Sequence, residues 1–116
     1  MGHAGLIWRG GIYQVQFGKP VGHEAGYWRP AVVVSADIVN QGPGLLVMVV
    51  PVTTVGYGLR SHVEVEASTS GLDHDSYARC DQLRAVSAER LGKRLGQVPI
   101  DTMRSIEQAL RFLLEL

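Results

Sequence analysis

The stretch SYARCDQLR, residues 76–84, places an Arg, the only Cys of the chain and an Asp next to one another. A thiol between two charges could be an activated nucleophile, or it could be core filler while the charges do the chemistry. Side chains alternate between the two faces of a strand, so Arg79 and Asp81 would share one face and Cys80 the other. The same alternation puts Gln82 on the Cys80 face. We therefore expect a packed thiol and an Arg79–Asp81 pair that is free to act.

On its own, this pair is most simply a solvated ion pair worth ~0–1 kcal/mol. Other chemically capable residues lie where apolar segments begin or end. His23 and Glu24 sit in a Gly-punctuated loop, Arg29 precedes the next apolar run, and Thr53 closes a third. Each could be an ordinary loop or turn residue. Functional residues gather on loops held by a rigid scaffold, so we expect these segments to converge at one rim of the fold.

Hydrophobic periodicity predicts the elements that would position them. Residues 11–18 and 62–67 alternate, as half-buried strands do, whereas 31–34 and 45–52 are continuously apolar, as strands covered on both faces are. The third of these strands, residues 45–52, would end at Pro51. Residues 77–86 are predicted as a fifth strand. A short helical turn and a short strand would follow within 86–99, and the other connections, including 36–44 and 67–76, would be loops.

The period changes to that of a helix from Asp101, which is a plausible N-cap. Met103, Ile106, Leu110 and Leu113 then form one apolar stripe. Strands first and one helix last predict a mostly β fold, a small antiparallel barrel or curled sheet with the helix packed on it. We expect a single domain over residues 1–116, with 1–7 as a poorly ordered lead-in.

Composition limits the function classes. The formal net charge is +0, with 11 basic and 11 acidic residues, so the chain lacks the global positive field that drives non-specific DNA binding. One Cys and the scattered His residues offer no metal-binding framework, and we expect neither metal nor cofactor. No apolar run approaches the ~20 residues of a membrane span, and the first residues do not form a signal peptide. We therefore expect a cytoplasmic protein without membrane contact.

Several motifs occur in an order that resembles a known family: GHE, RPAVVVS, VVPVTT, RCDQLR and GKRLGQVP, followed by a helix. From about Trp8 to Leu116 the chain resembles the MazF/PemK toxin endoribonucleases, especially the PemK/Kid branch. The resemblance implies an SH3-like barrel of the CcdB/PemK type with a C-terminal helix, acting as a homodimer. It also implies cleavage of single-stranded RNA at short sequence motifs, and a cognate MazE/PemI-like antitoxin whose flexible acidic segment lies over the RNA site.

The resemblance also implies roles for individual residues. The catalytic positions would be Asp81, Arg79, His23, Arg29 and Thr53. Glu24 and Gln82 match positions associated with RNA binding, and we add Thr54 as a further RNA contact. Trp28 and Tyr57 lie in or beside variable loops, where they could stack on unpaired bases or simply pack against the barrel. The loop from Val55 to Ser61 departs most from relatives, so the bases that are read are the least defined part.

The chemistry suits these residues. RNA carries its own nucleophile, the 2′-hydroxyl, so an enzyme needs only to deprotonate it, stabilise the anionic phosphorane and protonate the leaving 5′-oxygen. Asp81 is the candidate base, while Arg29 and Arg79 can bind the phosphate oxygens. The general acid stays open between Arg79, which the branch implies, and His23, which is the better proton donor. The products would be a 2′,3′-cyclic phosphate and a 5′-hydroxyl, without a metal ion.

Two other functions fit the same fold class. One is a CcdB-like toxin that inhibits gyrase, an activity that goes with a C-terminal Trp-Gly-Ile in that family; this chain instead ends Phe-Leu-Leu-Glu-Leu. The other is a non-catalytic binding module that kept the barrel. The joint presence of Arg79, Asp81, His23, Arg29 and Thr53 favours the nuclease over both.

Overall fold

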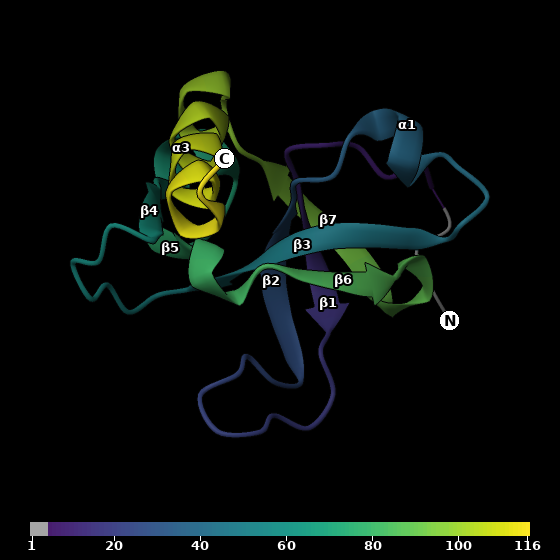
Figure 1. The fold of residues 1–116 in the computed structure, drawn as a ribbon, viewed down its shortest axis with the longest axis horizontal. Coiled ribbons are helices and arrows are strands. Elements are labelled where there is room, and N and C mark those ends of the chain that lie inside the picture. The colour runs from purple at the N-terminus through teal and green to yellow at the C-terminus, as the bar shows by residue number, and fades with distance from the viewer. Residues whose placement is uncertain (1–4) are drawn as a thin grey trace.

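The computed structural model describes residues 5–116 of the chain. A curled sheet fills the centre of the molecule and the C-terminal helix lies across one end of it (Figure 1). The elements in chain order are β1 (Gly11–Gln16), β2 (Trp28–Val33), α1 (Asp37–Asn40), β3 (Leu46–Thr53), β4 (His62–Val65), α2 (Ala67–Ser70), β5 (Ser76–Arg79), η1 (Cys80–Gln82), β6 (Arg84–Ser87), η2 (Ala88–Arg90), β7 (Leu91–Gln97) and α3 (Ile100–Leu114).

Neighbouring strands of the sheet are antiparallel, in the order β4-β5-β3-β2-β1-β7. The long strand β3 joins the two halves of the sheet. Its first residues, 46–49, pair with β6, while Val52 and Thr53 pair with β5. The mostly antiparallel sheet with a C-terminal helix confirms the fold predicted from the sequence.

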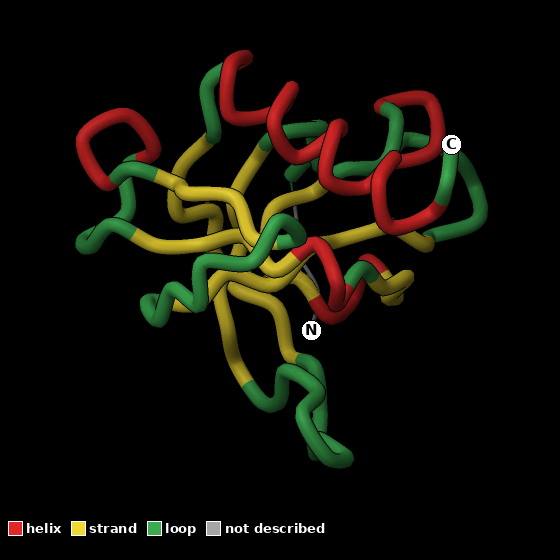
Figure 2. The backbone as a smooth tube through the Cα atoms, turned by 60° about the vertical axis from the view of Figure 1, so that its left-hand side comes forward, coloured by secondary structure: helices red, strands yellow, loops and turns green. Residues whose placement is uncertain are grey.

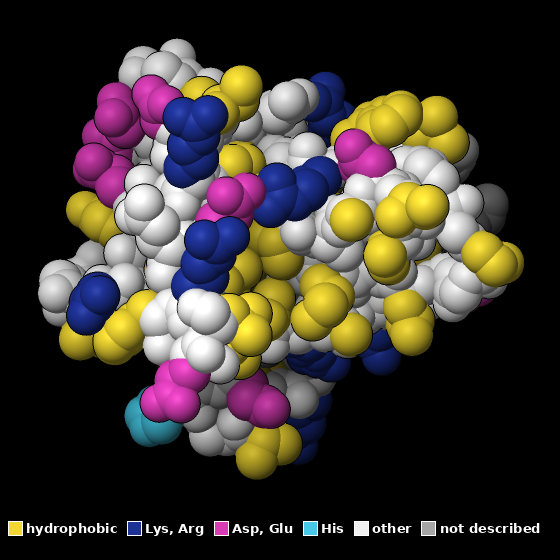
Figure 3. Space-filling model, turned by 45° about the horizontal axis from the view of Figure 1, so that its top comes forward, with side chains coloured by type: hydrophobic (Ala, Val, Ile, Leu, Met, Phe, Trp, Pro, Cys, Tyr) yellow, Lys and Arg dark blue, Asp and Glu magenta, His cyan; other side chains and the backbone are white. Residues whose placement is uncertain are grey.

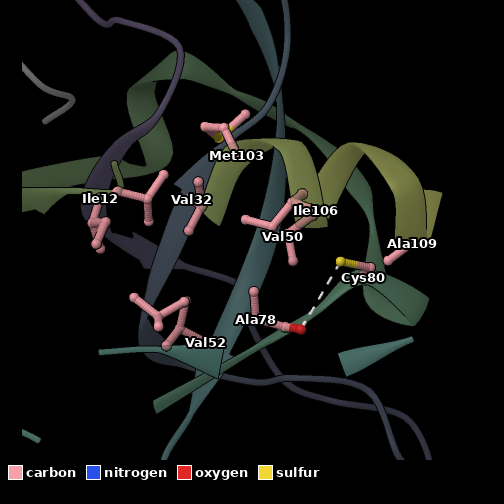
Figure 4. Close-up of a cluster of buried hydrophobic side chains, with 11 residues drawn as sticks. Ile12, Val32, Val50, Val52, Ala78, Cys80, Met103, Ile106 and Ala109 are labelled. Carbon is pink, nitrogen blue, oxygen red and sulfur yellow. Dashed lines mark hydrogen bonds between the residues drawn. The ribbon is translucent and has the colours of Figure 1, made fainter. Parts of the chain in front are cut away.

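Two hydrophobic clusters lie on opposite faces of this sheet. The cluster beneath α3 contains Val32, Val50 and Ile106, and Figure 4 shows them around the helix. The second cluster contains Tyr13 and Val33. Because β2 contributes alternate residues to both clusters, residues 31–33 are fully buried. The prediction of a doubly covered strand at this position is therefore confirmed.

The predicted fifth strand over residues 77–86 is wrong in its middle. The 3-10 turn η1 interrupts it and divides it into β5 and β6. At this point Cys80 N donates to Ser61 O and Leu83 N donates to Cys80 O, so the chain leaves the sheet for one turn. Cys80 still lies on the buried side with Ala78. Gln82, which the alternation placed beside Cys80, instead turns toward the loop between β1 and β2.

Other boundaries also differ from the prediction. β3 continues through Pro51, which pairs with Ala31 of β2, and two of the expected loops contain the short helices α1 and α2. The helix α3 begins at Ile100 with Pro99 as its N-cap residue, so Asp101 lies inside its first turn.

The apolar stripe of α3 ends earlier than predicted. Met103, Ile106 and Ala109 are buried and Leu110 is partly buried, while Leu113 is exposed. The buried stripe of α3 therefore ends at Leu110.

The predicted lead-in, residues 1–7, lies partly outside the described residues, and Ile7 within it is a buried member of the second cluster. Within residues 5–116, no helix has the length and apolar character that crossing a membrane requires.

Candidate active site

The loop of residues 17–27, between β1 and β2, projects from the sheet in Figures 1 and 2 and forms one wall of the site. Two backbone hydrogen bonds close its base, from Phe17 N to Tyr27 O at 2.8 Å and from Tyr27 N to Gly18 O at 2.7 Å. Gly26 permits the tight path, since a Cβ there would lie 2.4 Å from Pro20 Cδ. The sequence thus fixes a narrow loop that carries His23 near its tip.

Gln82 ties this loop to the turn η1. Its amide nitrogen donates to His23 O at 2.8 Å and its amide oxygen accepts from Ala25 N. Both ends of the Gln82 side chain are therefore engaged by backbone groups. The sequence prediction gave Gln82 a role in RNA contact, and the structure shows that it holds the loop carrying His23 against the turn carrying Asp81.

Arg79, the last residue of β5, and Asp81, in η1, form an ion pair. Arg79 Nη2 lies 3.1 Å from Asp81 Oδ2, and the two side chains are 23% and 31% exposed. The turn η1 therefore brings together the two charges that the alternation argument placed on one face. A pair that is partly open to solvent contributes little to stability, so its position in a hollow is the more informative fact.

His62, the first residue of β4, completes this cluster, and sequence reasoning missed it. Its Nε2 lies 3.3 Å from Asp81 Oδ1 and accepts from Arg79 Nε at 3.2 Å. Its side chain is only 1% exposed. The register that pairs His62 with Arg79 across β4 and β5 creates this contact. The segment HVEV signals a strand, but nothing in it reveals which residue lies opposite.

The predicted site residues line one connected depression. A hollow of about 340 Å³ is bordered by eight of the ten residues, namely His23, Glu24, Arg29, Thr53, Thr54, Tyr57, Arg79 and Gln82. A neighbouring hollow of about 630 Å³ shares His23, Arg79 and Gln82 and adds Asp81. Trp28 is the exception, because it faces a third groove of about 760 Å³ next to Lys93 and Arg94.

Comparison with known proteins places this chain in a family. The model of the PemK-like, MazF-like toxins of type II toxin–antitoxin systems matches residues 8–114. This chain belongs to that family. The match covers nearly the whole chain and every element from β1 to α3.

Two named relatives support the assignment. Endoribonuclease MazF9 of Mycobacterium tuberculosis is 34% identical, over 96% of this chain and 98% of the relative. Endoribonuclease EndoA of Bacillus subtilis is 29% identical, over 96% and 97%.

Solved structures agree with the sequence matches. The MazF of Deinococcus radiodurans superposes with a TM-score of 0.82 at 26% identity, covering 96% of this chain and 98% of that one. A mycobacterial endoribonuclease in complex with its cognate antitoxin gives a TM-score of 0.80 at 26% identity, covering 95% and 96%. The fold of this MazF-like chain is therefore that of the solved MazF toxins.

The single cysteine of this MazF-like chain belongs to the core. Figure 4 shows the Cys80 sulfur directed toward the Ala78 carbonyl, beside Ala109 of α3. Burial, and secondly the charge of Asp81, raise the pKa of the Cys80 thiol to about 12. A thiol that stays protonated at neutral pH is a poor nucleophile, so Cys80 has a packing role.

Arg84 is a second residue that sequence reasoning missed. It lines the hollow of about 630 Å³, and its Nη1 donates to Phe17 O at 3.2 Å. Its guanidinium carbon lies 5.5 Å from the centre of the Phe17 ring. Its place at the start of β6, immediately after the turn, could not be inferred while residues 77–86 were taken as one strand. Arg84 thus adds a further cation to the hollow of about 630 Å³.

Residues 5–116 contain no group of three or more His, Cys, Asp or Glu side chains arranged to hold a metal ion. The site itself brings together the carboxylates of Asp81 and Glu24, several guanidinium groups, the imidazoles of His23 and His62, and the hydroxyl groups of Thr53 and Thr54.

Proposed function

We propose that this chain is a toxin endoribonuclease that cleaves single-stranded RNA, without a metal ion, by attack of the 2′-hydroxyl on the adjacent phosphate. The observation that carries the proposal is the hollow itself, in which a carboxylate held by two neighbours lies beside guanidinium and hydroxyl groups that suit a phosphate. The names of the two relatives, both endoribonucleases, point to the same chemistry.

Asp81 acts as the general base in this proposal. One of its oxygens contacts Arg79 and the other contacts His62. A carboxylate oxygen has two lone pairs, so each oxygen keeps one that can accept the proton of the 2′-hydroxyl.

Arg29 and Thr53 bind the scissile phosphate. Both border the hollow of about 340 Å³, on the side formed by β2 and β3. A guanidinium placed in advance where the phosphorane gains negative charge lowers the barrier without reorganising in the transition state. The Thr53 hydroxyl, at the end of β3, would fix the orientation of the same group.

His23 is our choice for the general acid. Arg79 already donates from Nε to His62 and from Nη2 to Asp81, so two of its five N–H groups orient these side chains. A guanidinium also does not lose its proton in proteins. His23 is exposed in its loop and borders both hollows, where an imidazolium can protonate the leaving 5′-oxygen.

The RNA strand would cross the hollow and continue toward Trp28. Thr54 and Arg29 border both the hollow of about 340 Å³, here called the central hollow, and the groove of about 760 Å³ that contains Trp28 and Lys93. The two depressions therefore meet at these residues. Trp28 is 56% exposed and can stack on a base. Glu24 and Tyr57 line the central hollow, where they would contact the nucleotides next to the cut.

We further propose a homodimer and a cognate antitoxin of the MazE/PemI type as partners. Hydrophobic side chains gather on the side of the molecule that carries α1 (Figure 3), among them Ile38, Val39, Leu45, Leu46 and Met48. A second copy could cover this surface, which light scattering of wild type and Met48→Glu would test.

The antitoxin proposal is supported by a similar mycobacterial endoribonuclease that was solved with its cognate antitoxin. We place the toxin in the cytoplasm, where its RNA would be found.

The alternative functions have less support. A gyrase inhibitor or a non-catalytic barrel would not require a carboxylate held between a guanidinium and an imidazole. The relatives over nearly the full length of the chain are named as endoribonucleases.

The test is incubation of the purified chain, free of antitoxin, with a long unstructured RNA in EDTA, mapping every new end. Discrete cuts that Asp81→Asn lacks are expected, together with 2′,3′-cyclic phosphate and 5′-hydroxyl ends. Intact RNA would reject the nuclease proposal, and cuts that need a divalent ion would reject its mechanism.

A further inference from the structure

His62 is a buried imidazole that touches both members of the Arg79–Asp81 pair, and none of the proposed catalytic roles uses it. Its side chain is 1% exposed, against 23% for Arg79 and 31% for Asp81. An imidazole so covered cannot reach an RNA strand in the hollow. Any effect on the reaction must therefore pass through its two neighbours.

The imidazole is held on several sides. The His62 backbone pairs with Arg79 in the sheet, and its N–H donates to Leu59 O at 3.0 Å. The Tyr57 ring packs edge-on against it, with ring centres 5.7 Å apart and planes at 72°. The same Tyr57 ring lies 5.8 Å from the Arg79 guanidinium carbon. The His62 side chain is thus held rigidly by its surroundings, whereas Asp81 lies on the one-turn helix η1 at the surface.

The hydrogen-bond geometry shows which ring nitrogen of His62 contacts the Arg79–Asp81 pair. Nε2 is the atom within reach of both Arg79 Nε and Asp81 Oδ1, at 3.2 and 3.3 Å. One ring nitrogen can accept from the first or donate to the second, but it cannot do both at once. The Arg79 Nε–H always carries its proton and donates to Nε2, so Nε2 is the acceptor in this hydrogen bond and lies beside Asp81 Oδ1 without donating to it.

We propose that His62 is a positioning residue for the cleavage reaction: its Nε2 accepts from Arg79 Nε and so fixes the guanidinium, whose Nη2 holds Asp81 in the orientation a general base requires. This inference rests on the proposed ribonuclease function. Without His62, the Arg79 guanidinium could turn, and Asp81 would lose the fixed partner that orients it. A catalytic group displaced by about 1 Å can lose on the order of 100-fold in rate.

Replacements of His62 test this directly. The Gln amide oxygen reaches about as far as His Nε2 and can accept from Arg79 Nε, whereas the Asn amide is one methylene shorter and Leu cannot accept. We expect His62→Gln to keep most of the kcat of wild type. His62→Asn and His62→Leu should lose kcat by about 100-fold, with KM for RNA unchanged because the phosphate contacts of Arg29 and Thr53 remain.

The pair His62→Gln and His62→Asn is the matched comparison, since both side chains are polar amides, and thermal unfolding of each establishes that it folds. Equal activity of the two, or a loss that appears in KM alone, would overturn the positioning role. So would a loss of activity that follows the unfolding temperature rather than the reach of the side chain.

A second readout does not depend on cleavage. The Arg79 Nε–H should give a slowly exchanging side-chain resonance in the wild type and in His62→Gln, and this resonance should be lost in His62→Leu. If the wild type cuts no RNA, the ribonuclease proposal fails, while this resonance still decides whether His62 orders the pair. The same rapidly exchanging Arg79 signal in all three proteins would contradict the inference.

Discussion

At the scale of single residues, the site depends on how one carboxylate is held. Asp81 is partly open to solvent, yet each of its oxygens has a neighbour, Arg79 on one side and His62 on the other. The adjacent Cys80 has the opposite environment, with 1% of its surface exposed in the core. Two adjacent residues therefore have opposite environments, since the proposed general base is partly open to solvent and the thiol beside it is buried.

The buried thiol leads to a prediction about stability. The pKa of Cys80 is raised from 9.0 to about 12, so in alkaline solution the unfolded chain loses the thiol proton before the folded one does. The stabilisation is complete below pH 9 and decreases as the pH rises above it. The free energy of unfolding of wild type relative to Cys80→Ala should fall by about 1.4 kcal/mol per pH unit between pH 9 and 11.

Chemical denaturation of both proteins across this pH range measures the difference. A constant difference between them would show that the thiol ionises as readily in the folded chain as in the unfolded one. RNA cleavage by Cys80→Ala at neutral pH should stay close to that of wild type, since the thiol takes no part in the reaction.

At the scale of elements, the turn η1 decides what could be predicted from the sequence. Alternation over residues 77–80 correctly placed Cys80 in the core, because β5 is a regular strand up to Arg79. It failed for Gln82, because the 3-10 turn that reverses the side-chain direction has no Gly or Pro to signal it. His62 and Arg84 were missed for a related reason, since strand pairing brings them to the site and one sequence does not reveal which strands pair.

The connection between η1 and the loop of residues 17–27 can be tested at Gln82. Replacing it with Ala removes the hydrogen bonds to His23 O and Ala25 N, so the loop should open more often. We expect Gln82→Ala to be cut faster in the 17–27 loop by a protease and to lose cleavage activity by about 10-fold, since it misplaces His23.

Gln97→Ala is the matched control, because Gln97 bonds only to the surface residue Arg94 among its described side-chain contacts. Both variants should unfold at nearly the temperature of wild type. Unchanged proteolysis of the loop in Gln82→Ala would mean that other contacts hold it.

At the scale of the whole molecule, the balance of charge requires local recognition. The net charge is +0, and Figure 3 shows acidic and basic side chains interleaved over the face that it presents. Attraction of RNA must therefore come from local cations, and the two hollows around Asp81 contribute Arg29, Arg79 and Arg84. Single-stranded RNA should bind with a modest dependence on salt, unlike its binding to a strongly basic protein.

If each of these three Arg residues meets one phosphate, the logarithm of the binding constant should fall with the logarithm of salt concentration with a slope of about −2. Fluorescence anisotropy with an uncleavable RNA measures this slope. Arg29→Ala should reduce its magnitude by about 0.7, while Arg104→Ala, an exposed cation on α3, should leave it unchanged. An equal change in both variants would indicate binding to a diffuse surface charge.

The central claim is that the RNA supplies its own nucleophile to a site organised around Asp81. Once a cleavage motif has been mapped, the most direct test is a short RNA containing that motif, with a single 2′-deoxy substitution on the nucleotide 5′ to the cut. We predict that this RNA binds as the unmodified one does and is not cut at that bond. Cleavage of the deoxy-substituted bond at the normal rate would show that a different nucleophile attacks the phosphate, and the proposed role of Asp81 would be wrong.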